Sequence, residues 1–313
     1  MEALVPVQAQ PLAGAPASLE ALLQKFLEAQ DIASSSRATY GRQLKQLLSW
    51  LEQTGRVDRL STLLREDILA YKDHLLQLGL SSYTVSSYIT ATRKLFEWLE
   101  AEKVYPNIAR GVKGTKKAKG FRKDCLTPGQ IREALEAIDQ RTLEGLRDYA
   151  LLNLLLRTGL RTVEISTATL GDLRQESGSA VLWIRGKGRA SKDDFVLLVE
   201  ETLRPLRAYL SARGRLKESE PLFASGSRRN TGAALTTRSI SRIVKERLRA
   251  VGIDDSRLTA HSLRHTAITL SIKGGASLQQ AQAMARHTDP KTTLIYFHNL
   301  ARIEAGAERF ISF

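Results

Sequence analysis

The chain has 313 residues, and its 47 lysines and arginines against 33 aspartates and glutamates give a formal net charge of +14. This length predicts two domains, and the charge indicates a polyanionic partner, nucleic acid first and an acidic membrane second. No stretch reaches the roughly 18 unbroken apolar residues of a membrane span. The single cysteine, Cys125, excludes an intrachain disulfide and a zinc site built on a cysteine cluster, which fits a reducing cytoplasm. We expect a cytoplasmic protein whose partner is nucleic acid and not a membrane.

The N-terminal part is predicted to be helical. Residues 1–17 lack the basic start of a signal peptide and are expected to form a flexible lead-in. From 18 to 105, apolar residues recur at helical spacing in four groups, which predicts a four-helix domain. Residues 106–124 are rich in glycine and lysine without apolar periodicity. We interpret them as a basic linker that is either simply solvated or follows a phosphate backbone.

Residues 125–313 are predicted to form a second, mainly helical domain. Its first helix should begin with Thr127 as the cap and Pro128 in the first turn, and a longer helix from Leu143 to Arg157 should close at Gly159. Two β-prone runs, at 180–184 and 195–199, flank a polar turn with glycines and predict a β-hairpin. Further helices are expected over 201–213, 237–250, 262–272, 277–286, 290–298 and 301–310.

A set of cationic and proton-handling residues in this domain ends in a tyrosine. Its members are Arg161, Lys187, His261, Arg264, His287 and Tyr296. Cations that neutralise a phosphate, together with a phenol as nucleophile, suit an attack on a phosphodiester without a metal. His261 and Arg264 are three residues apart at a predicted helix start, so both can reach one anion from the same face.

Most of these residues also have a structural interpretation. Arg161 is followed one turn later by Glu164, which could hold its guanidinium in place or form only a surface ion pair. Tyr296 could simply pack with its apolar neighbours. His265, next to Arg264, is expected to point elsewhere and to be packed.

Lys187 lies between two glycines in the predicted hairpin turn. Such a turn can bring an ammonium close to a backbone, where it could donate a proton to a leaving 5′ oxygen. A turn lysine is normally solvated, and Lys192 competes for the same role.

Four segments that contain these residues resemble the tyrosine recombinases, also called the phage integrase family, and most of all its compact Xer-type members. They are TGLRTVEI, GKG, HSLRHTAIT and RHTDPKTTLIYFH. The N-terminal helices are similar to the family's core-binding, SAM-like domain. The resemblance therefore implies a mainly α fold with a small β-sheet, in which a four-helix core-binding domain and a mixed α/β catalytic domain form a C-shaped clamp.

The resemblance also implies an activity: a site-specific DNA recombinase that cuts and rejoins strands through a 3′-phosphotyrosyl intermediate and a Holliday junction, without metal, ATP or other cofactor. The implied roles are Tyr296 as nucleophile, Arg161 and Arg264 as phosphate clamp, Lys187 as general acid, His261 as proton-handling residue and His287 as hydrogen-bond donor.

Three positions depart from the family pattern. Arg286 stands where relatives commonly have glycine, Ser262 where they often have aspartate, and Asp194 where a basic residue is more usual. The last departure bears on the Lys187 assignment, because both residues belong to the predicted hairpin.

The implied partners are double-stranded DNA with an inverted-repeat core site and further copies of the chain. Four protomers on synapsed DNA would exchange a C-terminal helix at 301–313, whose apolar stripe comprises Ile303, Ala307, Phe310, Ile311 and Phe313. Alternatively this segment packs on its own domain. A second recombinase or an accessory protein is left open. Candidate DNA contacts are Arg37, Arg42, Lys45, Arg93, Lys94, Arg238, Arg242 and Lys245.

Two other functions fit the same residues less well. A type IB topoisomerase-like nicking enzyme would share the chemistry but lack synapsis, and a noncatalytic DNA-binding regulator would not need all six residues. For a recombinase, integration and excision, transposition and the resolution of DNA remain alternative roles.

Overall fold

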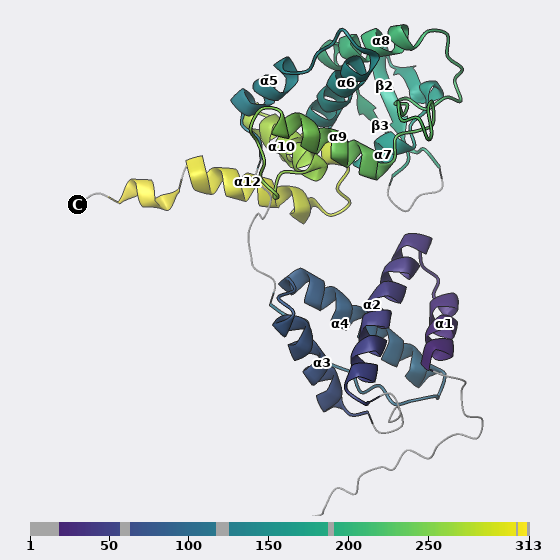
Figure 1. Ribbon diagram of the computed structural model, residues 1–313. Helices are drawn as coiled ribbons and strands as arrows, with labels where there is room; N and C mark the ends of the chain where they lie inside the picture. The colour runs from purple at the N-terminus through teal and green to yellow at the C-terminus, as the bar shows by residue number, and fades with distance from the viewer. Residues whose placement is uncertain (1–18, 57–62, 117–124, 187–190, 305, 312–313) are drawn as a thin grey trace, which may run out of the picture. The chain divides into compact units, whose positions relative to one another are not determined.

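The computed structural model describes residues 19–56, 63–116, 125–186, 191–304 and 306–311 (Figure 1). The chain divides between residues 119 and 120 into two compact units, unit 1 on the N-terminal side and unit 2 on the C-terminal side. No helix in the described ranges combines the length and the apolar character needed to cross a bilayer.

Unit 1 confirms the predicted group of four helices. They are α1 (Leu19–Ala29), α2 (Ser34–Gln53), α3 (Arg65–Gln77) and α4 (Ser82–Ala101). Each helix turns one apolar stripe inward, and the side chains of Phe26, Leu44, Tyr71 and Ile89 are almost fully buried in the shared core. Ser81 caps the start of α4, and its hydroxyl accepts a hydrogen bond from the Thr84 backbone N–H.

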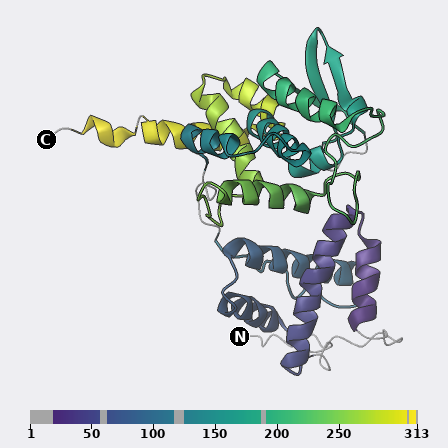
Figure 2. The same cartoon turned by 45° about the horizontal axis from the view of Figure 1, so that its top comes forward.

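Unit 2 is built around helix α6 (Leu143–Thr158). This helix is apolar on nearly all sides, and Leu151, Leu152, Leu154 and Leu155 are essentially inaccessible to solvent. A helix with this pattern must be covered on several faces. Helices α8 (Glu200–Arg213) and α10 (Ala260–Lys273) make its largest contacts, and α6 lies among its neighbours in Figures 1 and 2.

The remaining helices of unit 2 surround this core. They are α5 (Pro128–Glu136), α7 (Thr162–Ser166), α9 (Thr237–Arg249), α11 (Leu278–Ala285) and α12 (Pro290–Glu304). As predicted, Thr127 caps α5 and Pro128 occupies its first turn. The expectation of a separate helix over 301–310 was wrong. Helix α12 continues to Glu304, because no glycine or proline interrupts it, and the element that follows among the described residues is the short 3₁₀-helix η3 (Ala307–Phe310).

A three-stranded antiparallel sheet packs beside these helices, in the order β1 (Leu173–Glu176), β2 (Ser179–Ile184) and β3 (Asp194–Leu197). The predicted hairpin is confirmed as β2 and β3, in which Trp183 pairs with Phe195. Strand β1 was not predicted, because its sequence LRQE shows little β character. It joins β2 through Ser177 and Gly178, both with positive φ, which is the geometry of a tight hairpin turn.

Candidate active site

The first site residue follows a left-handed turn at the end of α6. Gly159 adopts φ 60° and ψ 25°, a conformation that glycine reaches without strain, and so ends the helix as predicted. Arg161 then precedes α7, and its Nη1 donates to Oε1 of Glu164 at 2.7 Å while its backbone N–H donates to Oε2 at 2.7 Å. Because the Glu164 side chain is fully buried, this is an internal ion pair that orients the guanidinium and not a surface pair.

The second arginine, Arg264, comes from α10 and is 2% exposed. Its Nη1 donates to the Gly159 carbonyl at 2.6 Å, and its Nη2 donates to the carbonyl of Ala285 at the end of α11. Burial, followed by the neighbouring charges of Arg161 and Arg286, lowers the pKa of Arg264 to about 10. The side chain therefore stays cationic at neutral pH and lies beside the first arginine.

His261 lies one turn before Arg264 on α10 and is exposed. A pocket of about 280 Å³ is lined by His261, Arg161 and residues of three elements around them. Arg161 and His261 thus line one open cavity, in which an anion could contact both side chains.

Tyr296 projects from α12 into the interior of unit 2 and is 4% exposed. Its hydroxyl is hydrogen-bonded to Nδ1 of His265, and the two rings are stacked with centroids 5.6 Å apart. The expectation that His265 points away from the site was wrong, because α12 packs on the side of α10 that carries this histidine. Burial raises the pKa of Tyr296 to about 12, although the charge of Arg264 acts in the opposite direction.

His287 lies between α11 and α12, with its ring centroid 6.3 Å from that of Tyr296. Its Nδ1 lies 2.9 Å from the hydroxyl of Thr293, which is completely buried. Burial, and then the charges of Arg264 and Arg161, lower the pKa of His287 to about 4, so the ring is neutral at physiological pH. If the threonine hydroxyl donates to Nδ1, the proton of the neutral ring is on Nε2, which can then donate to an anion.

The sixth predicted residue, Lys187, lies outside the described residues. Lys192, its competitor in the sequence, forms an ion pair with the buried carboxylate of Asp172. The same carboxylate accepts hydrogen bonds from the backbone N–H and the hydroxyl of Thr169. In this arrangement Lys192 therefore has a structural partner.

The candidate DNA contacts are mostly exposed. Seven of the eight, all but Lys245, have exposed side chains, and Arg238 and Arg242 lie one turn apart on α9. Lys245 instead donates to the Asp255 carbonyl at 2.7 Å and pairs with Asp254 at 3.0 Å. Its charge is thus used within the chain. Among the described residues, no group of three or more His, Cys, Asp or Glu side chains is arranged to hold a metal ion.

Comparison with known proteins identifies the class of this chain. The sequence profile of the phage integrase family matches residues 124–302, and that of the phage integrase N-terminal SAM-like domain matches residues 19–103. The first match alone covers more than half of the chain. The chain therefore belongs to the phage integrase family, as its motifs predicted.

Individual relatives agree with this assignment. The chain is 28% identical over 291 residues to the tyrosine recombinase XerD of Halalkalibacterium halodurans, across 88% of this chain and 92% of that protein. Among solved structures, the XerH site-specific recombinase bound to a palindromic difH substrate in a post-cleavage complex has a TM-score of 0.71, at 21% identity over 93% of this chain and 84% of that one. A lambda integrase tetramer bound to a Holliday junction has a TM-score of 0.68, at 15% identity over 90% and 77%. The predicted fold, mainly helical with a small antiparallel sheet and a SAM-like domain before the catalytic domain, and the enzyme class, a site-specific recombinase, are confirmed.

Proposed function

We propose that this member of the phage integrase family recombines DNA at a specific site, with Tyr296 as its nucleophile. The phenol loses its proton as its oxygen attacks the scissile phosphorus, the bond from phosphorus to the 5′ oxygen breaks, and the 5′ oxygen takes up a proton, so that one proton leaves and one is delivered. The resulting 3′-phosphotyrosyl ester keeps the phosphodiester linkage, so the 5′ hydroxyl of another strand can reverse the attack without ATP and generate a Holliday junction. The observation that supports this most directly is the convergence of Arg161, Arg264, His287 and Tyr296 from different elements of unit 2.

The arginines are proposed to bind the nonbridging oxygens of the scissile phosphate. A guanidinium fork matches two such oxygens, and charge that is preorganised in a partly dry site acts most strongly on the transition state. His261 faces the same pocket as Arg161 and is proposed to handle a proton there. The neutral ring of His287 would donate to the phosphate through Nε2, while Lys187 is proposed as the acid that protonates the 5′ oxygen.

Tyr296 cannot attack from its present position, because its hydroxyl is buried and bound to His265. We therefore propose that DNA binding shifts α12 and frees the phenol. Support comes from the C-terminal end of the chain, where α12 continues past the other helices of unit 2 (Figures 1 and 2). Beyond it, Phe310 and Ile311 are 82% and 64% exposed. Apolar side chains so exposed are suited to dock on another copy, which would be the proposed exchange of the 301–313 segment.

The proposed substrate is double-stranded DNA with two inverted half-sites, bound by both units as a clamp. Unit 1 would be the core-binding domain over 18–105, residues 106–124 a basic linker, and 125–313 the catalytic domain. The charge of +14 and the exposed cations of α2, α4 and α9 favour phosphate contacts. Two duplexes need four cuts, so we propose a tetramer, consistent with the lambda integrase tetramer on a Holliday junction.

We also propose where the chain works and which cellular processes it serves. The chain would work in the cytoplasm, in agreement with its single cysteine, on integration and excision, on transposition or on the resolution of DNA. A second recombinase or an accessory protein would be an additional partner.

The test uses a duplex whose site is selected from random DNA by binding to the full chain. A nick near the cleavage point lets the short product strand diffuse away, so that the covalent intermediate accumulates. The wild-type chain should give an SDS-resistant adduct, and Tyr296→Phe should give none. Strand exchange between two such duplexes then distinguishes a recombinase from a nicking enzyme, and absence of any adduct would leave only a DNA-binding role.

A further inference from the structure

Arg286 occupies a backbone conformation that does not suit an arginine. It caps α11 with φ 51° and ψ 48°, in the left-handed region, at the position where the family pattern has glycine. Of the three described non-glycine residues with positive φ, Lys103 and Ser177 are exposed, whereas the Arg286 side chain is 5% exposed. A buried cation on a strained backbone indicates that the side chain has a specific partner.

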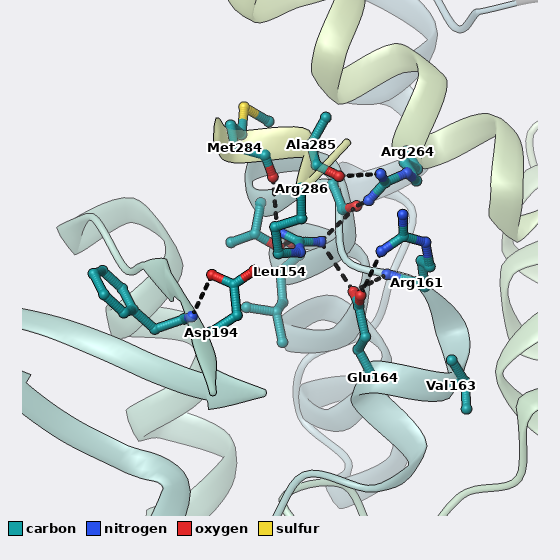
Figure 3. A network of polar contacts seen from close by, with 12 residues as sticks. Leu154, Arg161, Val163, Glu164, Asp194, Arg264, Met284, Ala285 and Arg286 are labelled. Atoms are coloured by element: carbon teal, nitrogen blue, oxygen red, sulfur yellow. Dashed lines mark hydrogen bonds and ion pairs between the residues drawn. The ribbon is translucent and has the colours of Figure 1, made fainter. Parts of the chain in front are cut away.

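That partner is the acidic residue of the candidate active site. Figure 3 shows the Arg286 guanidinium between the end of α11 and the start of α7. Its Nη2 donates to Oε2 of Glu164 at 2.9 Å and to the Gly159 carbonyl at 3.3 Å, and its Nη1 donates to the Met284 carbonyl at 2.6 Å. Its Nε is buried and makes no hydrogen bond with any described residue. The guanidinium is thus committed to the network and does not reach solvent.

The network joins Arg286 to both arginines of the proposed phosphate clamp. Glu164 Oε2 accepts from Arg286 and from the Arg161 backbone, and Oε1 accepts from the Arg161 side chain. The Gly159 carbonyl accepts from Arg286 and from Arg264. One group therefore links Arg286 to each clamp residue: the Glu164 carboxylate to Arg161, and the Gly159 carbonyl to Arg264.

The charge balance suggests what this arrangement does. Glu164 is a buried anion beside the proposed phosphate site, and Arg161 is its other cationic partner among the residues that the structure describes. If Arg161 alone neutralised this carboxylate, its charge would be used within the protein and would act less on a phosphate. A second cation on Oε2 offsets the carboxylate and leaves the charge of Arg161 available for the ligand.

We infer that Arg286 is a positioning residue of the active site: through Glu164 and the Gly159 carbonyl it holds Arg161 and Arg264 in place, and it neutralises the carboxylate that would otherwise compete with the scissile phosphate. This inference rests on the proposed function, because it assigns phosphate binding to the two clamp arginines. A glycine at 286 would remove the strain of the positive φ. It would also remove one of the two described cations that pair with Glu164, and Arg161 would be the other.

The experiment measures single-turnover cleavage by the full chain at saturating DNA, on a nicked duplex with an ordinary phosphate or an uncharged methylphosphonate at the scissile position. The variants are Arg286→Gly, Arg286→Lys and, as the test of the clamp itself, Arg264→Ala. Arg207→Gly is the matched control, because Arg207 is an exposed arginine of α8 in a surface pair with Glu200. DNA affinity and the thermal unfolding of unit 2 are measured for each variant, and all assays run below its transition.

On the phosphate substrate Arg286→Gly should cleave roughly 100-fold more slowly at unchanged DNA affinity, because misplacement of a catalytic charge by about 1 Å has an effect of this order. Arg286→Lys should cleave about tenfold faster than Arg286→Gly, since lysine keeps the charge but not the forked geometry of the guanidinium. On the methylphosphonate the loss for Arg286→Gly should shrink to about threefold or less, because less phosphate charge remains to be matched.

Two results would overturn the inference while leaving the proposed function intact: cleavage by Arg286→Gly at the rate of Arg207→Gly, or an equal loss on the charged and the uncharged substrate. The second result would assign Arg286 a role in folding only. If Arg264→Ala cleaved the phosphate substrate at the wild-type rate, the phosphate clamp itself would be wrong. If Arg286→Gly does not fold, the Lys variant gives the same comparison between substrates.

Discussion

The buried carboxylate of Glu164 gives the sharpest prediction about stability. Its side chain is fully buried and accepts three hydrogen bonds, at 2.7, 2.7 and 2.9 Å, from Arg161 and Arg286. The substitution Glu164→Gln keeps the shape but removes the charge, and it turns an NH₂ group toward one of these donors. Two guanidinium groups would then remain close together around a neutral amide. Removing one partner of a buried ion pair costs about 3–5 kcal/mol.

This free energy corresponds to a large thermal shift. In a unit of this size, 1 kcal/mol lowers Tm by about 2–4 °C, so the unfolding of unit 2 should move down by about 6–20 °C. Differential scanning calorimetry of the full chain can follow the two units separately. The transition of unit 1 should not move, because Glu164 belongs to unit 2, and it serves as an internal control.

A matched substitution tests whether burial is the cause. Glu200→Gln removes a carboxylate that pairs with Arg207 and whose side chain is 66% exposed. It should therefore lower the free energy of unfolding by less than about 1 kcal/mol. A shift of unit 2 by less than about 3 °C in Glu164→Gln, or equal shifts in the two variants, would refute the reasoning.

Three further predictions concern single residues of unit 2. Gly159→Ala should lower the free energy of unfolding in urea by about 1–2 kcal/mol, because alanine is strained at positive φ. The added Cβ itself would not clash, since the nearest side-chain atoms lie 3.6 Å away. An unchanged free energy of unfolding would contradict this. The pKa of His287 is about 4 in the folded chain and 6.5 ordinarily, so between these pH values the unfolded chain binds a proton that the folded chain does not. The free energy of unfolding should therefore fall as the pH drops from 6.5 to 4, and His287→Gln should lack the share of this fall that comes from His287. Identical pH profiles for the two proteins would contradict this. Nitration of Tyr296, which is 4% exposed, should be much slower than nitration of Tyr83, which is 45% exposed. Binding of DNA should accelerate the nitration of Tyr296. Equal rates for the two tyrosines without DNA would contradict the burial of Tyr296.

Local signals in the sequence were sufficient for much of the site. The glycine after α6, the acidic residue one turn after Arg161 and the spacing of His261 and Arg264 each act within a few residues, so the helix end, the ion pair and the shared helix could be predicted. The four-helix unit 1 followed from apolar periodicity in the same way.

Contacts between distant elements could not be predicted from these signals. The His265–Tyr296 hydrogen bond depends on which side of α10 receives α12, and sequence spacing does not determine this. The contacts of Arg286 depend on the end of α11 lying close to Gly159 and Glu164, more than a hundred residues earlier. Strand β1 was missed because polar residues on a short strand carry little periodic signal.

The central claim is that the phenolic oxygen of Tyr296 forms the covalent bond to DNA. The most direct measurement is mass spectrometry of the SDS-resistant adduct after digestion with nuclease and protease. The account predicts a nucleotide joined through its 3′ phosphate to the peptide that contains Tyr296. An adduct on another residue, or one linked through a 5′ phosphate, would contradict it.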